Sequence, residues 1–156
     1  MVNKKVSIIG CGNIGISLLL GLLRGQTIRP ENIIATRRNI GELDYLKEFG
    51  VKLTANNISA IKESDLIIIA VKPYNIISVL EELKDHLNPD KHKLISVTTG
   101  VTISKIEEVV GTRIPIFRAM PNISASVGKS VTCVCYNKAK TEEIIQFIHG
   151  KFLLLV

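Results

Sequence analysis

A glycine pattern close to the amino terminus is the feature of this sequence that most directly predicts binding chemistry. Val6 to Ile9 form a short apolar run that leads into Gly10-Cys11-Gly12-Asn13-Ile14-Gly15, and a strongly apolar stretch follows. This order predicts a strand, a glycine turn and a helix, as in sites that bind a dinucleotide. Gly10 would permit the tight turn, Gly12 would leave room for a pyrophosphate, and Gly15 would let the helix approach the strand. The N–H groups and the positive dipole end of the helix would then face the phosphates.

A second group of polar residues follows the next predicted strand, in the segment Thr36-Arg37-Arg38-Asn39. The segment lies about 20 residues beyond the last glycine of the pattern, where a site for NAD(H) places an acidic residue on the ribose hydroxyl. The segment itself contains no acid. Arginine offers a fixed fork of donors to phosphate oxygens, so Thr36, Arg37 and Arg38 predict a site for a 2′-phosphate. The expected cofactor is therefore NADP(H), with NAD(H) as a second option, unless the arginines are only solvated surface charge.

Three later segments also follow predicted strands and carry candidate site residues. They are Ala70-Val71-Lys72-Pro73, Thr98-Thr99-Gly100 and Arg118-Ala119-Met120-Pro121-Asn122. Open α/β sheets bind ligands beyond the carboxyl ends of their strands, so we expect these segments to gather at one edge. The first would contact the adenosine half of a dinucleotide, and the other two would converge near the nicotinamide. Taken alone, each segment could also be an ordinary loop without a binding role, and only their shared position after strands favours a site.

The elements that must position these residues alternate along the chain. Apolar runs and turn residues predict strands over Val6–Ile9, Asn32–Thr36, Val51–Thr54, Leu66–Val71, Leu94–Val97, Ile114–Arg118, Ser130–Tyr136 and Phe152–Val156. Helices are predicted over Ser17–Leu23, Glu42–Phe49, Ser59–Glu63, Ile76–Leu87, from a capping box at Ser104–Glu107, and over Thr141–His149. Such alternation favours right-handed βαβ units and predicts an α/β fold with a doubly wound, mostly parallel, Rossmann-like sheet over residues 1–156.

Composition limits the class of protein. The chain has 156 residues, of which 46% are hydrophobic, enough for the core of one domain. The apolar run that begins at Ile14 ends at Arg24, short of the ~20 residues of a membrane span, and no signal peptide is recognisable, so we expect a soluble, cytoplasmic protein. A net charge of +6 suits an anionic ligand. Scattered lysines and a 4% aromatic content make nucleic acid a third-ranked partner.

The cysteines and histidines suggest no chemistry of their own. Cys11, Cys133 and Cys135 form no metal-ligand spacing and are expected to be small core residues. His86, His92 and His149 have no partner suggested by spacing and are expected at the solvated surface. The sequence therefore predicts no metal site and identifies no catalytic acid or base.

Taken together, the segments resemble pyrroline-5-carboxylate reductase. The resemblance rests on Gly10 to Gly15, Asn57, Ala70 to Pro73, Gly100-Val101-Thr102-Ile103-Ser104, and Arg118 to Asn122 followed by Val127-Gly128. These segments occur in the same order as in the family, and the match extends from Met1 to Val156. Members of that family reduce pyrroline-5-carboxylate to proline with NADPH or NADH, in the last step of proline biosynthesis.

The resemblance implies a role for each matching residue. It assigns the pyrophosphate to the loop of Gly10, Gly12, Asn13, Ile14 and Gly15, the 2′-phosphate side to Thr36 and Arg37, and the length of the nucleotide to Asn57 and Ala70 to Lys72. It places Thr99, Gly100, Met120, Pro121 and Asn122 at the nicotinamide. This chain departs from the family at Ile14, where the family usually has Met, at Thr98-Thr99 in place of Ala-Ala, and at Ile123-Ser124 in place of Thr-Pro.

The family also implies a second part of the protein. Its members continue into a helical domain that forms the dimer and holds the substrate carboxylate, and this sequence stops before that domain. The resemblance therefore predicts the cofactor domain of a homo-oligomeric enzyme that acts on a cyclic imine, and predicts that the 156-residue chain alone is inactive. The alternative is a reductase-like NADPH-binding regulatory or competence-associated protein without turnover.

Overall fold

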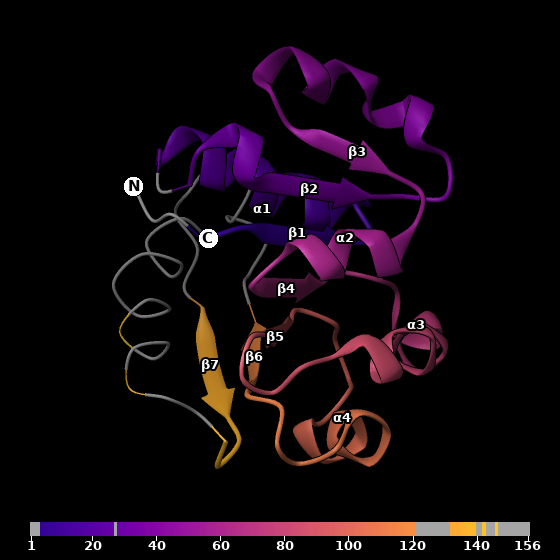
Figure 1. The fold of residues 1–156 in the computed structure, drawn as a ribbon, viewed down its shortest axis with the longest axis vertical. Coiled ribbons are helices and arrows are strands. Elements are labelled where there is room, and N and C mark those ends of the chain that lie inside the picture. Colours follow the sequence, from indigo (N-terminus) through magenta and orange to yellow (C-terminus); the bar gives the residue numbers. More distant parts are fainter. Residues whose placement is uncertain (1–3, 27, 121–131, 140–141, 143–145, 147–156) are drawn as a thin grey trace.

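The computed structural model describes residues 4–26, 28–120, 132–139, 142 and 146, and the described strands form one sheet with helices around it (Figure 1). The strands are β1 (Val6–Ile9), β2 (Ile33–Thr36), β3 (Lys52–Thr54), β4 (Leu66–Ile69), β5 (Lys93–Ser96), β6 (Ile116–Met120) and β7 (Cys133–Tyr136). The α-helices are α1 (Asn13–Arg24), α2 (Asn57–Glu63), α3 (Ile76–Leu83) and α4 (Ile103–Val110). Four 3-10 segments are η1 (Pro30–Asn32), η2 (Ile40–Phe49), η3 (Pro73–Asn75) and η4 (Lys84–His86).

The strand order is β3-β2-β1-β4-β5-β6-β7, with β1 near the centre. β1 pairs in parallel with both β2 and β4, and β6 with β7 is the one antiparallel pair among the described strands. From β1 the chain winds first toward β3 and then, after β4, in the opposite direction. Ligands of open α/β sheets bind at such a reversal, beyond the carboxyl ends of the strands. The predicted doubly wound, mostly parallel, Rossmann-like α/β fold is confirmed.

Two apolar layers hold the sheet between its helices. Successive side chains of a strand point to opposite faces, and β1 and the fully aliphatic strand β4 are buried along their whole length. One face of β1 packs through Ile8 against Leu18 and Leu19 of α1. The opposite face packs through Ile9 against residues of α2, α3 and α4, including Leu80. The two layers hold the strands in place, and the candidate site residues follow the carboxyl ends of these strands.

Two helical segments differ from their predictions. Residues 40–49 form the 3-10 helix η2, where an ordinary helix was predicted over Glu42–Phe49. Its two buried residues, Leu43 and Leu46, lie three apart and align on one face at three residues per turn. Helix α4 begins before the predicted capping box, because the Thr102 side chain accepts a hydrogen bond from the Lys105 N–H at 3.3 Å. Ser104 lies within the helix.

Other predicted boundaries shift by a few residues. β6 extends to Met120 rather than ending at Arg118, and the described part of β7 begins at Cys133. α3 ends at Leu83, and η4 completes the predicted helix. The predicted strand over Phe152–Val156, most of the helix over Thr141–His149, and the candidates Pro121 and Asn122 lie outside the described residues.

Three predictions about burial were wrong. Cys11 is buried as predicted, but Cys133 and Cys135 are exposed on β7. That strand pairs only with β6 among the described strands and is therefore an edge, where half of the side chains have no layer above them. His92 was predicted at the surface and is 3% exposed, packed at the turn before β5, whereas His86 is exposed as predicted. His149 lies outside the described residues.

Candidate functional site

The glycine turn after β1 is held by contacts that leave no room for side chains at two of its positions. Gly10 has φ +85°, and a Cβ there would lie 2.5 Å from Cγ1 of Val71. A Cβ at Gly15 would lie 2.9 Å from the carbonyl oxygen of Gly10. Both distances are too short for real atoms, so these two glycines are required by the protein itself. This agrees with the roles predicted for them, the tight turn and the close approach of helix to strand.

Gly12 is different, because a Cβ there would meet no protein atom within 4 Å. Gly12 is the N-cap of α1 and has φ −85°, a value that any residue can adopt. No side chain caps this helix, and its first turn contains no acidic residue. The first N–H groups of α1 therefore face an open space and favour an anion there. The space and its donors fit the pyrophosphate predicted from the sequence.

A chain of hydrogen bonds joins the glycine turn to β2 and α2. The Thr36 hydroxyl accepts from the Gly10 N–H at 3.2 Å and donates to Oδ1 of Asn57 at 2.7 Å. The Asn57 amide in turn donates to Glu82 at 3.1 Å. Thr36 is 1% exposed, so its single hydroxyl hydrogen is committed within the protein. Thr36 and Asn57 therefore position the glycine turn, whatever contact Thr36 makes with a 2′-phosphate.

The two arginines after β2 lie in different environments. Nη1 of Arg37 donates to the carbonyl oxygen of Cys11 at 3.1 Å, and Nη2 pairs with the carboxylate of Glu42 from η2. The other carboxylate oxygen of Glu42 accepts from Asn39 at 3.1 Å. Arg38 is exposed. An acid thus reaches the end of β2 from η2, although the segment Thr36 to Asn39 contains none.

These residues border one cavity of about 500 Å³ at the carboxyl ends of β1, β2, β4 and β5. The predicted site residues that line it are Gly10, Gly12, Asn13, Ile14, Thr36, Arg37, Arg38, Asn57, Ala70, Val71, Lys72, Pro73 and Thr99. Gly15, Gly100 and Met120 are described but do not line it. Gly15 lies against Gly10 beneath the turn, and Gly100 has φ +76° in the turn after β5. The cavity is in the size range of ligand pockets.

The sequence interpretation missed several lining residues. They are Ile9, Asn39, Glu42, Ala55, Asn75, Val79, Val97 and Thr98. The apolar members are ends of strands or a helix position and carry no signal beyond hydrophobicity. Thr98 was noted with its neighbours, and its hydroxyl donates to the Val71 carbonyl at 3.2 Å, joining two segments of the rim. Glu42 is five residues beyond Arg37, and only the path of η2 brings the two together.

Cys11 lies within the glycine turn but is not a candidate nucleophile. Burial raises the pKa of the Cys11 thiol to about 12, and neither the Thr36 backbone nor Arg37 offsets that effect. The thiol therefore stays protonated near neutral pH, and only the thiolate is reactive. Within the described part of the chain, no group of three His, Cys, Asp or Glu residues could hold a metal ion. In the same residues, no helix is long and apolar enough to cross a membrane.

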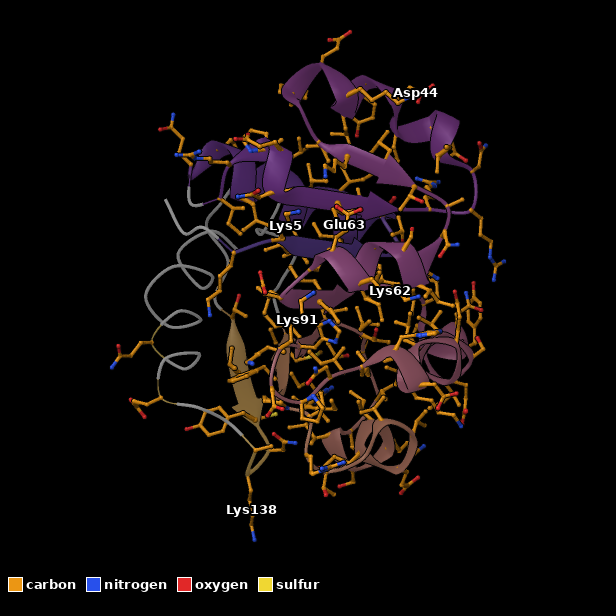
Figure 2. All side chains as sticks on the ribbon, in the orientation of Figure 1. Lys5, Asp44, Lys62, Glu63, Lys91 and Lys138 are labelled. Carbon is orange, nitrogen blue, oxygen red and sulfur yellow. The ribbon has the colours of Figure 1, made fainter. Side chains whose placement is uncertain are left out.

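Much of the positive charge lies away from the cavity, at the amino ends of the strands. Figure 2 shows Lys5, Lys62, Glu63 and Lys91 on this part of the surface. Lys5 pairs with Glu63 at 3.7 Å, and Lys91 donates to the Lys62 carbonyl at 2.6 Å. A hydrogen bond from Lys52, together with its charge, lowers the pKa of Glu63. These lysines serve local contacts, and the cations available to a ligand in the cavity are Arg37, Arg38 and Lys72.

The fold and the site together identify the class of protein to which this chain belongs. A parallel sheet with this strand order, a glycine turn leading into an uncapped helix, and a cavity at the reversal point make a Rossmann-like NAD(P)-binding domain. Residues 5–100 match the family model described as NADP oxidoreductase coenzyme F420-dependent. The chain therefore belongs to that family.

The resemblance to pyrroline-5-carboxylate reductases is also confirmed, and the chain corresponds to their N-terminal NADP-binding domain. It is 36% identical over 135 residues to pyrroline-5-carboxylate reductase 2 of Dictyostelium discoideum, covering 85% of this chain and 45% of that protein. It is 35% identical over 146 residues to the enzyme of Methanosarcina acetivorans, covering 92% of this chain and 53% of that protein. The chain thus spans about half the length of the curated relatives it matches.

Solved structures of the same family superpose closely. A pyrroline-5-carboxylate reductase of Coxiella burnetii matches with a TM-score of 0.92 at 32% identity, over 99% of this chain and 57% of that one. The Plasmodium falciparum pyrroline carboxylate reductase, solved with NADP bound, matches with a TM-score of 0.86 at 28% identity, over 99% of this chain and 56% of that one.

Proposed function

We propose that this chain is the NADP(H)-binding domain of a pyrroline-5-carboxylate reductase. The observation that carries the proposal is the single cavity bordered by both the glycine turn and the arginines after β2. A pyrophosphate at the first position and a 2′-phosphate at the second are the two anionic groups of one NADP molecule. The described residues provide donors and positive charge at both, and the relative from Plasmodium falciparum was solved with NADP bound.

The residues would hold the cofactor in order along the cavity. The first turn of α1 would face the pyrophosphate, Arg38 and Arg37 would face the adenosine ribose, and Ala70 to Pro73, which line the same cavity, would lie along the nucleotide. Thr99, which lines the cavity, would border the nicotinamide end. The family resemblance also assigns Gly100 and Met120 to that end, although neither lines the cavity. When bound, the reduced nicotinamide supplies a hydride, and this chain supplies binding, orientation and exclusion of water. No described residue stands out as an acid or base for the reaction.

Residues 1–156 would form one cofactor domain, as the sequence predicted. The substrate would be a small cyclic imine, pyrroline-5-carboxylate, reduced at its C=N bond to proline. In the complete protein the enzyme would be a cytoplasmic homo-oligomer, with the substrate pocket completed outside this domain. These assignments come from the family and not from contacts in this chain.

Calorimetric titration of the chain with NADP⁺ and with NAD⁺ tests the proposal. We expect NADP⁺ to bind roughly tenfold more tightly, because a hydrogen bond to a charged group contributes on the order of 1.5 to 3 kcal/mol. A 2′-phosphate adds such bonds, and NAD⁺ lacks it. Failure of the folded chain to bind either cofactor would refute the proposal. Equal affinities would leave a dinucleotide-binding domain but remove the assignment to NADP(H).

A further inference from the structure

Glu42 is the acid that the end of β2 lacks in the sequence. It lies in the first turn of η2 and lines the cavity beside Arg37, Arg38 and Asn39. Both of its carboxylate oxygens are engaged, one by Nη2 of Arg37 and the other by the amide of Asn39. The Glu42 side chain is 50% exposed, and Glu42 is one of the residues that line the cavity.

The pairing changes the charge that a ligand meets. Arg37 also donates Nη1 to the Cys11 carbonyl, so its guanidinium is tied to the glycine turn on one side and to Glu42 on the other. Arg37 and Glu42 together carry no net charge, and Arg38 is the second cation at this end of the cavity. A carboxylate is an acceptor only, whereas a ribose 2′-hydroxyl can donate. A 2′-phosphate cannot donate to it when fully ionised and would be repelled by its charge.

We infer that Glu42 is a specificity-determining residue that lowers the ratio of the affinity of this domain for NADP(H) to its affinity for NAD(H). Its carboxylate occupies Nη2 of Arg37, a donor that a 2′-phosphate would otherwise use, and it offers an acceptor to the free 2′-hydroxyl of NAD(H). Arg38 then supplies most of the selectivity for the phosphate. The inference rests on the proposed function, because it requires that the adenosine ribose lie at this end of the cavity.

The variant Glu42→Gln tests the inference. Glutamine keeps the shape and one carbonyl acceptor but removes the negative charge. We expect affinity for NADP⁺ to rise and affinity for NAD⁺ to stay level or fall, so that their ratio increases by roughly three- to tenfold. Glu48→Gln is the matched control, because it makes the same charge change in an exposed residue of η2 outside the cavity, and its ratio should equal that of the unchanged protein.

Both affinities are measured by calorimetry on the full chain, and thermal unfolding checks that each variant folds. A higher ratio in Glu42→Gln alone supports the inference. An unchanged or lower ratio, or an equal rise in Glu48→Gln, overturns it while cofactor binding stands. If the unchanged protein binds neither cofactor, the proposed function fails and the inference fails with it. Should Glu42→Gln not fold, Glu42→Ala gives the second comparison, because it removes both the negative charge and the acceptor, and the ratio should again rise.

Discussion

At the scale of single residues, the three glycines of the turn have different requirements. Gly10 and Gly15 are enforced by neighbouring protein atoms, at 2.5 and 2.9 Å from an added Cβ, whereas Gly12 faces open space. A substitution at Gly12 therefore costs the fold little and affects only what enters that space. A Gly12 variant therefore tests ligand binding separately from protein stability.

We expect Gly12→Val to abolish NADP⁺ binding while the protein remains folded. The branched side chain would fill the space beside the first N–H groups of α1, and affinity should drop by at least roughly a hundredfold. Calorimetry measures the binding, and circular dichroism and thermal unfolding check the fold. Gly15→Ala is the contrasting variant, because its Cβ would press on the Gly10 carbonyl and lower the unfolding temperature without any ligand. Full affinity in folded Gly12→Val would show that the turn is structural only.

The two arginines should behave differently when replaced. Arg38→Ala is expected to weaken NADP⁺ binding about tenfold and to leave NAD⁺ binding nearly unchanged, because our proposal assigns Arg38 to the 2′-phosphate. Arg37→Ala is expected to weaken both cofactors, because Arg37 also supports the glycine turn through the Cys11 carbonyl. Side-by-side titration of both variants with both cofactors separates these roles. The assignment would fail if Arg37→Ala alone removed the discrimination and left NAD⁺ binding intact.

At the scale of elements, the site depends on links between neighbouring strand ends. The Thr36 hydroxyl joins β2 to the turn after β1, and Asn57 joins both to α2. Thr98 joins the end of β5 to the segment after β4. These side chains hold backbone segments that a dinucleotide would contact. The turn before β5, in contrast, is held by a buried histidine at the opposite edge of the sheet.

His92 should make the protein less stable in mild acid. Its Nδ1 accepts from the Asn88 N–H at 2.9 Å, and burial, followed by the charge of Lys91, lowers the pKa of His92 below its ordinary value of 6.5. Below about pH 6.5 the unfolded chain thus binds a proton that the folded chain resists, so the free energy of unfolding falls as the pH falls. His92→Asn keeps an acceptor near the Asn88 N–H but does not titrate. We expect this variant to lose less stability between about pH 7 and pH 5.

Urea unfolding at several pH values measures this effect. The exposed His86 provides the control, since His86→Asn should leave the pH dependence as it is in the unchanged protein. If His92→Asn and the unchanged protein lose stability in parallel, the acid sensitivity comes from other groups.

At the scale of the whole molecule, the sheet separates two regions of charge. At the amino ends of the strands, Lys5 pairs with Glu63, and Lys91 donates to the Lys62 carbonyl. Figure 2 labels these four residues. The cavity at the carboxyl ends contains two arginines, one lysine and Glu42. An anionic cofactor is therefore attracted to one edge of the sheet, where α1 also directs its positive end.

We expect the 156-residue chain to bind NADPH but to show negligible turnover of pyrroline-5-carboxylate. Hydride transfer requires the imine to lie about 3 to 3.5 Å from the nicotinamide, and lost positioning forfeits several kcal/mol of barrier reduction. Our proposal assigns the described lining residues to the cofactor, and none of them to the imine. A steady-state assay that follows NADPH absorbance measures turnover, with Gly12→Val as the blank. Robust turnover by the unchanged chain would show that this domain completes an active site unaided.

The sequence by itself determined the fold and the glycine turn. Alternating apolar runs and helical segments specify a doubly wound sheet, because each element buries its apolar face, and the glycines at 10 and 15 mark where the backbone must turn or approach closely. Positions after the predicted strands indicated most of the cavity lining, and the family resemblance added Asn57. Local patterns were less informative for the exact starts of helices, since Thr102 and Ser104 are both good caps and only hydrogen bonding selected Thr102.

Only the tertiary structure decided which polar groups meet. Glu42 of η2 pairs with Arg37 after β2, and the Thr36 hydroxyl of β2 donates to Asn57 of α2. His92 is buried. Each of these features depends on how separate elements pack together. The exposure of Cys133 and Cys135 likewise depends on β7 lying at an edge. The periodicity of apolar residues indicates which face of one element packs against the core. Ion pairs and hydrogen bonds between side chains depend instead on the distances between elements, and the folding of the whole sheet sets those distances.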